Sequence, residues 1–388
     1  MKRWVSRPAV IALVAVLAVF AWQSLTVHFN YGGNWTALFC TGARLQAPPQ
    51  LDWEGIYRFP ASDGYDGQFY HYLAHDPFLR KGFDGYMDDA RLRYRRILVP
   101  AAAYLLAAGQ DRYVDTAVFA VLWLSVLLGA YWLSRLAELS GRNPAWGLGF
   151  LLVPATIVSV DRMVVDATLA ALTAGFAYYS SRGGGWGLYL LLTCACLTRE
   201  TGFLLLAAYL FSLLWRRRLR MAGLFATSAV PALAWSWHVA SLTRPDLLGK
   251  LASQSPMGYL RFRAWRTPDY SFPDLISLAL KALDYLLLAA IALAIVLAVR
   301  SALKPSRDPR GFAALAFAVF MIAAGINFTL LDPFTFPRIA SPLLLLVGME
   351  SLGGGWRFSW APLAAVALRT CAQLVPQALG ILRGLIGQ

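Results

Sequence analysis

The stretch AVIALVAVLAVFAWQSL, residues 9 to 25, decides the fold class, because it is apolar for nearly the length that a lipid bilayer requires. It follows Lys2, Arg3 and Arg7, and a basic flank of this kind is typical of a segment whose N-terminal end stays in the cytoplasm. The stretch lacks the small-residue cleavage site of a secretory signal. Comparable apolar runs recur to the end of the chain, so we interpret the stretch as an uncleaved signal anchor.

The composition of the whole chain indicates the same class. Of the 388 residues, 58% are hydrophobic and 14% are charged, and 14 Trp, 17 Tyr and 22 Phe are present. A chain of this composition consists mostly of transmembrane helices and does not divide into soluble domains. We therefore predict an all-α polytopic membrane protein with a single integral membrane domain over residues 1–388.

The net charge of +14 does not indicate a nucleic-acid partner, because the basic residues are scattered over the segments between apolar runs. That pattern follows the positive-inside rule for proteins in a lipid bilayer. The four cysteines add little: three lie inside apolar runs, and Cys40 is alone in a polar segment. They predict neither a disulfide framework nor a metal cage.

The apolar runs predict about eleven membrane crossings. With a cytoplasmic N-terminus, the first crossing leaves residues 30–96 outside as a long loop that carries interfacial helices. The run 97–108 is too short to span, so we expect a re-entrant or interfacial helix there. The crossings are expected at 8–29, 113–136, 144–160, 166–181, 185–198, 201–215, 221–240, 275–299, 311–331, 337–352 and 358–375.

With these crossings, the cytoplasmic side carries the basic clusters WRRRLR (215–220) and RSALKPSRDPR (300–310), and the C-terminus lies outside. Residues 241–273 become a second extracytoplasmic loop. Polar residues that are not membrane anchors then gather on the outer face, in the segments 30–96, 161–166, 199–200, 241–273 and 332–338. We expect a functional site on that face.

The most unusual of these segments is GYDGQFYHYLAHDP, residues 64–77, which combines two Asp, two His and four aromatic residues. A helix that starts at Gly67 would be amphipathic and would lie in the membrane interface. Its apolar face would carry Phe69, Tyr70, Leu73 and Ala74. Asp66 would stand at the N-terminal end, either as a helix cap or as a functional carboxylate.

Arginines follow in ARLRYRRILVP, residues 90–100, on the side where the positive-inside rule disfavours them. They either anchor the chain to lipid headgroups or hold a phosphate, to which the planar guanidinium fork is suited. Together with aromatic faces for a sugar ring, they fit a lipid-linked sugar phosphate. A phosphate leaving group needs no general acid, so one carboxylate, as base, is enough.

Four motifs in this order resemble the GT-C superfamily of polytopic glycosyltransferases. The first three resemble the Y-D-G-x-x-Y, F-P-x-x-P and A-x-x-R-x-x-G elements of the branch that contains the GPI mannosyltransferases, and the fourth resembles the late helix rich in Arg and Pro that is found across the superfamily. They are YDGQFYHYLA (65–74), RYRRILVPAAAYLLA (93–107), CLTRETGFLLL (196–206) and FPRIASPLLLL (336–346).

The resemblance implies a hexosyltransferase that moves a sugar, with inversion, from a polyprenyl-phosphate donor to a glycan or glycolipid acceptor. It implies a multi-pass protein of a bacterial inner (plasma) membrane with its active site on the extracytoplasmic face. The motif aspartate, the base, corresponds to Asp66 here. The residues expected to bind substrate are Tyr65, Gln68, Tyr70, Arg93, Arg95, Arg96, Arg199, Glu200 and Arg338.

The chain departs from the superfamily in one motif. Many members carry a paired acidic motif after the first helix, whereas this chain has FNYGGNW at 29–35. The candidates for a second carboxylate are Asp63, Asp76, Asp161 and Asp166. Asp76, before Pro77, is also expected to end a helix.

The sequence leaves two questions open: whether the histidines bind a metal, and what role Arg199 and Glu200 have. His71 and His75 have the i, i+4 spacing of metal ligands, but the chain has only four His, so we interpret them as surface or interface residues. We expect no cofactor, while a divalent metal stays open. Arg199 and Glu200 pair with each other or with neighbouring helices, and such a buried pair either serves the site or is architectural.

Two other functional classes compete with a transferase. A transporter or lipid flippase places ionisable residues near the membrane midplane, where this chain offers only Arg369. A non-catalytic subunit of a polysaccharide assembly machine is the third alternative.

Overall fold

The computed structural model describes residues 8–243, 270–304, 308–323, 334–352 and 358–387. It is 79% helical. The predicted all-α class is therefore confirmed. Most of the predicted second outer loop, residues 244–269, lies outside the described residues, as do Asp332 and the basic residues before Pro8.

Within the described residues, four helical segments are long and apolar enough to cross a membrane, and a fifth is added if one bent pair counts as a span. The bent pair is η4 (Pro144–Leu152) with α6 (Pro154–Arg162), which meet at 59°. The predicted eleven crossings are not confirmed. The four segments are α1 (Pro8–Tyr31), α5 (Asp111–Leu139), α13 (Asp274–Ala302) and Ala361–Leu385, the last made of α17 (Ala361–Cys371), η8 (Ala372–Leu374) and α18 (Val375–Leu385).

The other apolar runs form shorter helices. Helices of 13 to 16 residues rise only about 20–24 Å, which is less than the hydrocarbon core of a bilayer. One predicted crossing, 221–240, is divided into α10 (Leu219–Ala226), η6 (Thr227–Ala229) and α11 (Val230–Leu242). The remaining helices are α7 (Asp166–Ser181), α8 (Trp186–Thr198), η5 (Glu200–Gly202), α9 (Phe203–Trp215), α14 (Pro309–Ala323) and α16 (Thr335–Met349).

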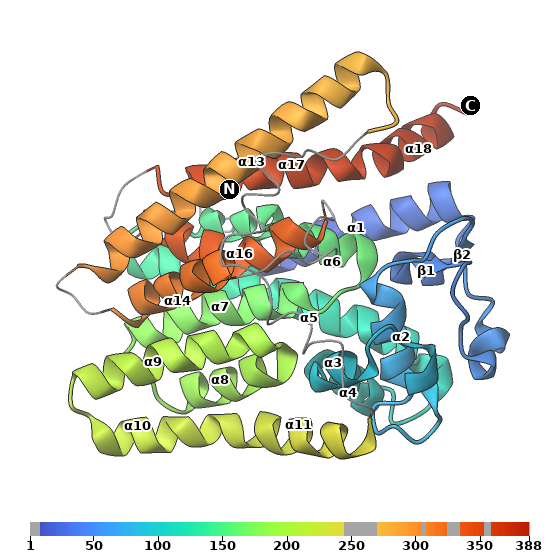
Figure 1. Ribbon diagram of the computed structural model, residues 1–388. Coiled ribbons are helices and arrows are strands. Elements are labelled where there is room, and N and C mark those ends of the chain that lie inside the picture. Colours follow the sequence, from blue (N-terminus) through green and yellow to red (C-terminus); the bar gives the residue numbers. More distant parts are fainter. Residues whose placement is uncertain (1–7, 244–269, 305–307, 324–333, 353–357, 388) are drawn as a thin grey trace.

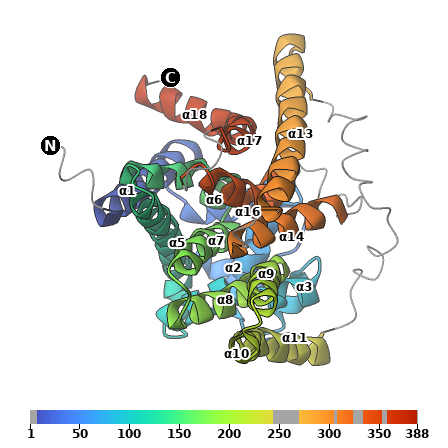
Figure 2. The same cartoon turned by 90° about the vertical axis from the view of Figure 1, so that its left-hand side faces the viewer.

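The helices pack around one large apolar core. Helix α5 lies against α1, η4 and α7, while α13 lies against α14 and α17. Helix α16 joins the two groups, because it contacts α6 and α7 on one side and α13, α14 and α17 on the other (Figures 1 and 2). Large apolar side chains such as Leu17, Leu275 and Leu278 stay exposed on the outside of this bundle. Exposed apolar helices of this length indicate a lipid bilayer as the environment.

The segment 30–96 is folded rather than an open loop. Its two short strands pair in parallel, with Thr41 opposite Arg58. The segment and the α9–α10 turn, which carries residues 215–220, lie at opposite ends of the molecule (Figure 1). Its elements, with the helix that follows, are η1 (Trp35–Phe39), β1 (Thr41–Gly42), η2 (Pro49–Glu54), β2 (Arg58–Phe59), α2 (Asp66–His75), η3 (Phe83–Tyr86), α3 (Ala90–Arg95) and α4 (Leu98–Leu106).

Helix α2 differs from the predicted interfacial helix. It starts at Asp66, and every residue from Gly67 to His75 is buried, so no polar face is left for the membrane interface. Its polar side chains have partners in the protein; Gln68, for example, bonds the Gly42 amide and the Asp63 carbonyl. A Cβ at Gly67 would lie 2.1 Å from the carbonyl oxygen of Arg162. Glycine therefore permits the close contact between α2 and the end of α6.

Candidate functional site

Asp66 lies between two arginines. Arg93, on α3, donates a hydrogen bond of 2.7 Å from Nη2 to Asp66 Oδ1, and Arg338, on α16, donates from Nη2 to Oδ2. The N-cap position of α2 is occupied by Tyr65, while Asp66 is the first residue of the helix. The carboxylate thus joins three helices that are far apart in sequence, and helix capping does not explain it.

These contacts fix the charge of Asp66. Burial by itself raises the pKa of this carboxyl, but the guanidiniums of Arg338 and Arg93 outweigh burial and hold the pKa well below its usual range. Asp66 is therefore ionised at neutral pH. Its side chain keeps 18% of its surface exposed, so a small polar group can reach it.

A second ion pair extends the site inward. Arg199, which precedes η5, donates to Asp166 at the start of α7. Arg338 Nη1 lies 3.4 Å from Asp166 Oδ2, so Arg338 bridges the Asp66 and Asp166 carboxylates. Arg338 Nε and Nη1 are buried and make no hydrogen bond to any described residue. These donors can serve an additional acceptor.

Arg96 and Glu200 form a third pair. Arg96 Nε lies 3.1 Å from Glu200 Oε2, and Arg96 Nη1 donates to the Tyr70 hydroxyl at 2.9 Å. Burial raises the pKa of Tyr70, but Arg96 and Arg93 outweigh burial and lower it. Arg199 is paired with Asp166 and Glu200 with Arg96, so of the two predicted alternatives the pairing with neighbouring helices is confirmed and the pairing with each other is not.

Four buried arginines thus meet at one end of the bundle. Two of their partner carboxylates, Asp66 and Asp166, are mostly buried. The other two are more exposed: the side chain of Asp88, which accepts a hydrogen bond of 2.7 Å from Arg93, is 44% exposed, and that of Glu200 is 40% exposed. The exposed carboxylates can exchange with another anion at little cost in desolvation. The arginines are Arg93, Arg96, Arg199 and Arg338.

A cleft of about 270 Å³ opens at the start of α2. At its margin the Arg162 guanidinium packs 4.9 Å from the Tyr65 ring centre, and the Arg338 guanidinium lies 5.0 Å from the same ring. Tyr65 therefore separates the cleft from the arginine cluster. The cleft is lined by Tyr31, Cys40, Phe59, Pro60, Ser62, Gly64, Asp161, Arg162 and Gln377.

The four candidates for a second carboxylate lie in different surroundings. Asp161 lines the cleft, where Gln377 donates to it at 3.1 Å, and Asp166 belongs to the arginine cluster. Asp63 is exposed and 3.9 Å from Arg44. Asp76 follows the end of α2, as predicted, and accepts hydrogen bonds from the amides of Arg80 and Lys81.

Three other candidates lie apart from Asp66. Gln68 holds the loop between β1 and α2 through its two backbone hydrogen bonds. Arg95 makes no ion pair with a carboxylate of the described residues. Arg91, in the same cluster, donates to the backbone carbonyls of Ala240 and Thr243 and so attaches α3 to α11.

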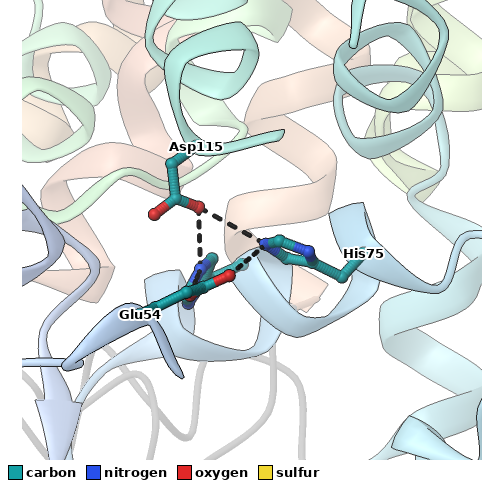
Figure 3. A group of neighbouring side chains, drawn as sticks. Glu54, His75 and Asp115 are labelled. Carbon is teal, nitrogen blue, oxygen red and sulfur yellow. Dashed lines mark hydrogen bonds and ion pairs between the residues drawn. The ribbon is translucent and has the colours of Figure 1, made fainter. Parts of the chain in front are cut away.

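The prediction of surface or interface histidines is wrong. His71 and His75 are fully buried, and with Glu54 and Asp115 they form a group whose ligand atoms all lie within 4.8 Å of one another (Figure 3). Sequence analysis missed both carboxylates, because they lie in separate segments. The only signal was the i, i+4 spacing of the histidines, repeated by Asp111 and Asp115.

Arg369 has a partner as well. Its Nε lies 2.7 Å from Asp284 Oδ1, so the pair joins α17 to α13, and Arg369 Nη2 donates to the Tyr270 hydroxyl. A buried, satisfied ion pair between two helices is readily explained as architectural.

Comparison of the chain with protein-family models, curated proteins and solved structures gives no match.

Proposed function

We propose that the chain is a membrane glycosyltransferase that moves a sugar from a polyprenyl-phosphate donor to a glycan or glycolipid acceptor. One observation supports this most: an ionised carboxylate, Asp66, is fixed by two guanidiniums where buried arginines from separate segments meet. Arginine forks suit a phosphate, and a carboxylate beside them suits the proton of an attacking hydroxyl.

The donor phosphate would exchange with the exposed carboxylates of the cluster. Asp88 and Glu200 are the more exposed partners of Arg93 and Arg96, so a phosphate can take their places while Asp66 and Asp166 stay bound. Arg338 Nε, which makes no hydrogen bond to any described residue, can donate to the phosphate as well. The negative charge of the bound phosphate offsets part of the charge of the arginines, so the pKa of Asp66 is lowered less and its basicity rises.

The reaction is a single displacement. The acceptor oxygen attacks the anomeric carbon and its proton passes to Asp66, while the bond between that carbon and the phosphate oxygen breaks with its electron pair on the phosphate. The arginines neutralise the charge of the leaving phosphate. No general acid is required, and the configuration at the anomeric carbon inverts.

A vesicle assay tests this function against transport. Purified protein is reconstituted with a polyprenyl phosphate that carries a radiolabelled sugar, and label is measured both in the free acceptor and in each leaflet. We expect label to leave the polyprenyl donor and to appear on the acceptor. Movement of intact donor between the leaflets would identify a flippase, and an intact, immobile donor would identify a non-catalytic subunit.

The proposal also includes a membrane orientation. Positive-inside bias places residues 215–220 in the cytoplasm. Segment 30–96 lies at the opposite end of the molecule, so we propose that it faces outside in a bacterial inner membrane (Figure 1). The site around Asp66 would then be extracytoplasmic.

Cysteine labelling on intact cells measures this orientation. In a chain whose native cysteines are replaced by Ser, we expect an impermeant maleimide to label Arg44→Cys, because Arg44 is exposed in segment 30–96. Arg218→Cys, exposed in the basic cluster, should be labelled only after lysis. The reverse pattern would contradict an extracytoplasmic site.

A further inference from the structure

A group of ligand-type side chains lies at the C-terminal half of α2, apart from Asp66 at its start. His71 and His75 on α2 and Asp111 and Asp115 on α5 are i, i+4 pairs, and each such pair lies on one face of its helix. Glu54, the last residue of η2, comes from a third segment. Figure 3 shows Glu54, His75 and Asp115 pointing toward one another.

The distances in this group are those of a coordination shell. His71 Nε2 lies 3.1 Å from Glu54 Oε2 and 2.8 Å from Asp115 Oδ1. His75 Nε2 lies 3.2 Å from Glu54 Oε1 and 3.4 Å from Asp115 Oδ1. Nitrogen and oxygen ligands at about 2.0–2.2 Å from a tetrahedral Zn²⁺ are roughly 3.4 Å apart. The imidazoles and carboxylates therefore have nearly the separations that such an ion requires.

Hydrogen bonds account for only part of the arrangement: they join His75 to Asp115 and Asp111, but not His71 or Glu54. Both ring nitrogens of His71 and both carboxylate oxygens of Glu54 are buried without a hydrogen bond to any described residue, although they lie close together. The side chains of His71 and Glu54 are 0% and 4% exposed. Buried polar atoms normally have partners, so atoms that converge without hydrogen-bonding geometry indicate a missing ligand.

The ring nitrogen of His75 that points away from the group is held by a carboxylate, as is usual for a metal-bound histidine. His75 Nδ1 lies 3.0 Å from Asp111 Oδ1, so a carboxylate can fix the ring with Nε2 directed at the group. Lys81 Nζ in turn holds the Asp111 carboxylate at 2.7 and 2.9 Å. The ring of His71 is held by stacking on Phe39, with ring centres 4.1 Å apart.

The charges are also complementary. Asp111 is neutralised by Lys81, which leaves the carboxylates of Glu54 and Asp115 beside two imidazoles. A divalent cation with two neutral histidines makes this group neutral, as two protonated imidazoles would, and charges are seldom buried without such compensation.

We propose that Glu54, His71, His75 and Asp115 bind a divalent transition-metal ion, with Zn²⁺ the best match to two imidazoles and two carboxylates. Four protein ligands close the shell, as in structural zinc sites. The ion joins η2 and α2 to the start of α5. It thereby stabilises the folded segment 30–96.

The test uses the full chain, purified in detergent through a tag without histidine. After exposure to Zn²⁺ and removal of free metal, we expect about one Zn²⁺ per chain. Co²⁺ in its place should give the strong visible absorption of a tetrahedral complex. A chelator should lower the Tm of the parent protein, and Zn²⁺ should restore it. Because this comparison uses the parent chain, it does not depend on the folding of a variant.

Substitutions locate the ion. Glu54→Gln and His71→Gln should abolish the Co²⁺ absorption, and Asp111→Asn should weaken metal affinity by about tenfold to hundredfold. His238→Gln, at an exposed histidine on α11, is the matched control and should change nothing. The proposal is overturned if the parent chain retains no metal and its Tm does not change when the chelator is added. Equal binding by all variants would also overturn it, since the ion would then lie elsewhere.

Discussion

Asp66→Asn is expected to slow sugar transfer by about a hundredfold to ten-thousandfold, the range for loss of a general base. Asn cannot take the proton of the acceptor hydroxyl. Donor binding should persist or strengthen, because Arg93 and Arg338 lose the competing charge of Asp66. Initial transfer rates and donor affinity, measured on the same preparation, separate the two effects.

Folding must be measured in parallel, because the substitution leaves two buried guanidiniums beside a neutral amide, and a broken buried pair is destabilising. Asp63→Asn is the matched control, since Asp63 lies three positions earlier, is exposed and is 3.9 Å from its nearest ionic partner. We expect the control to transfer at the parent rate. A folded Asp66→Asn protein within a few-fold of that rate would exclude Asp66 as the base and leave Asp161 and Asp166 as candidates.

Arg338→Lys is expected to weaken donor binding by roughly tenfold to hundredfold, which corresponds to the loss of one or two charge-assisted hydrogen bonds. Lysine keeps the charge but not the planar fork that reaches both Asp66 and Asp166. Titration of the purified protein with a polyprenyl phosphate measures the change.

The control for this exchange is Arg91→Lys. Arg91 attaches α3 to α11 through backbone carbonyls, so its loss can shift the Tm but should leave the donor affinity unchanged. Equal affinity of the parent and Arg338→Lys proteins for the polyprenyl phosphate would contradict a role of Arg338 in binding the phosphate.

The sequence predicted the long helices well, because apolar length is a local property. The predicted run 275–299 lies within α13, and the predicted 166–181 coincides with α7. It did not predict the break at Val153, after which α6 starts with Pro154, or the division of 221–240. These breaks depend on packing against neighbouring helices as much as on local sequence.

The residue types of the site were also predictable, but their pairing was not. Asp66 and Arg338 stood out as polar residues in apolar surroundings, yet they are 272 positions apart and meet only when the fold brings the first turns of α2 and α16 together. The partners Asp88 and Glu54 carry no local signal that separates them from surface carboxylates, and Asp115 carries only its i, i+4 spacing from Asp111. For the same reason the buried histidines were taken for surface residues.

The stereochemistry of transfer tests the central claim most directly, which is that one carboxylate acts as a base beside a phosphate leaving group. The polyprenyl-phosphate sugar is incubated with the protein and a simple alcohol, whose glycoside does not change its anomeric configuration in solution, and the product is analysed by NMR. We expect a single product with inverted configuration at the anomeric carbon, as a single displacement requires. A product with retained configuration would contradict the claim, because it would require a second displacement through a covalent intermediate.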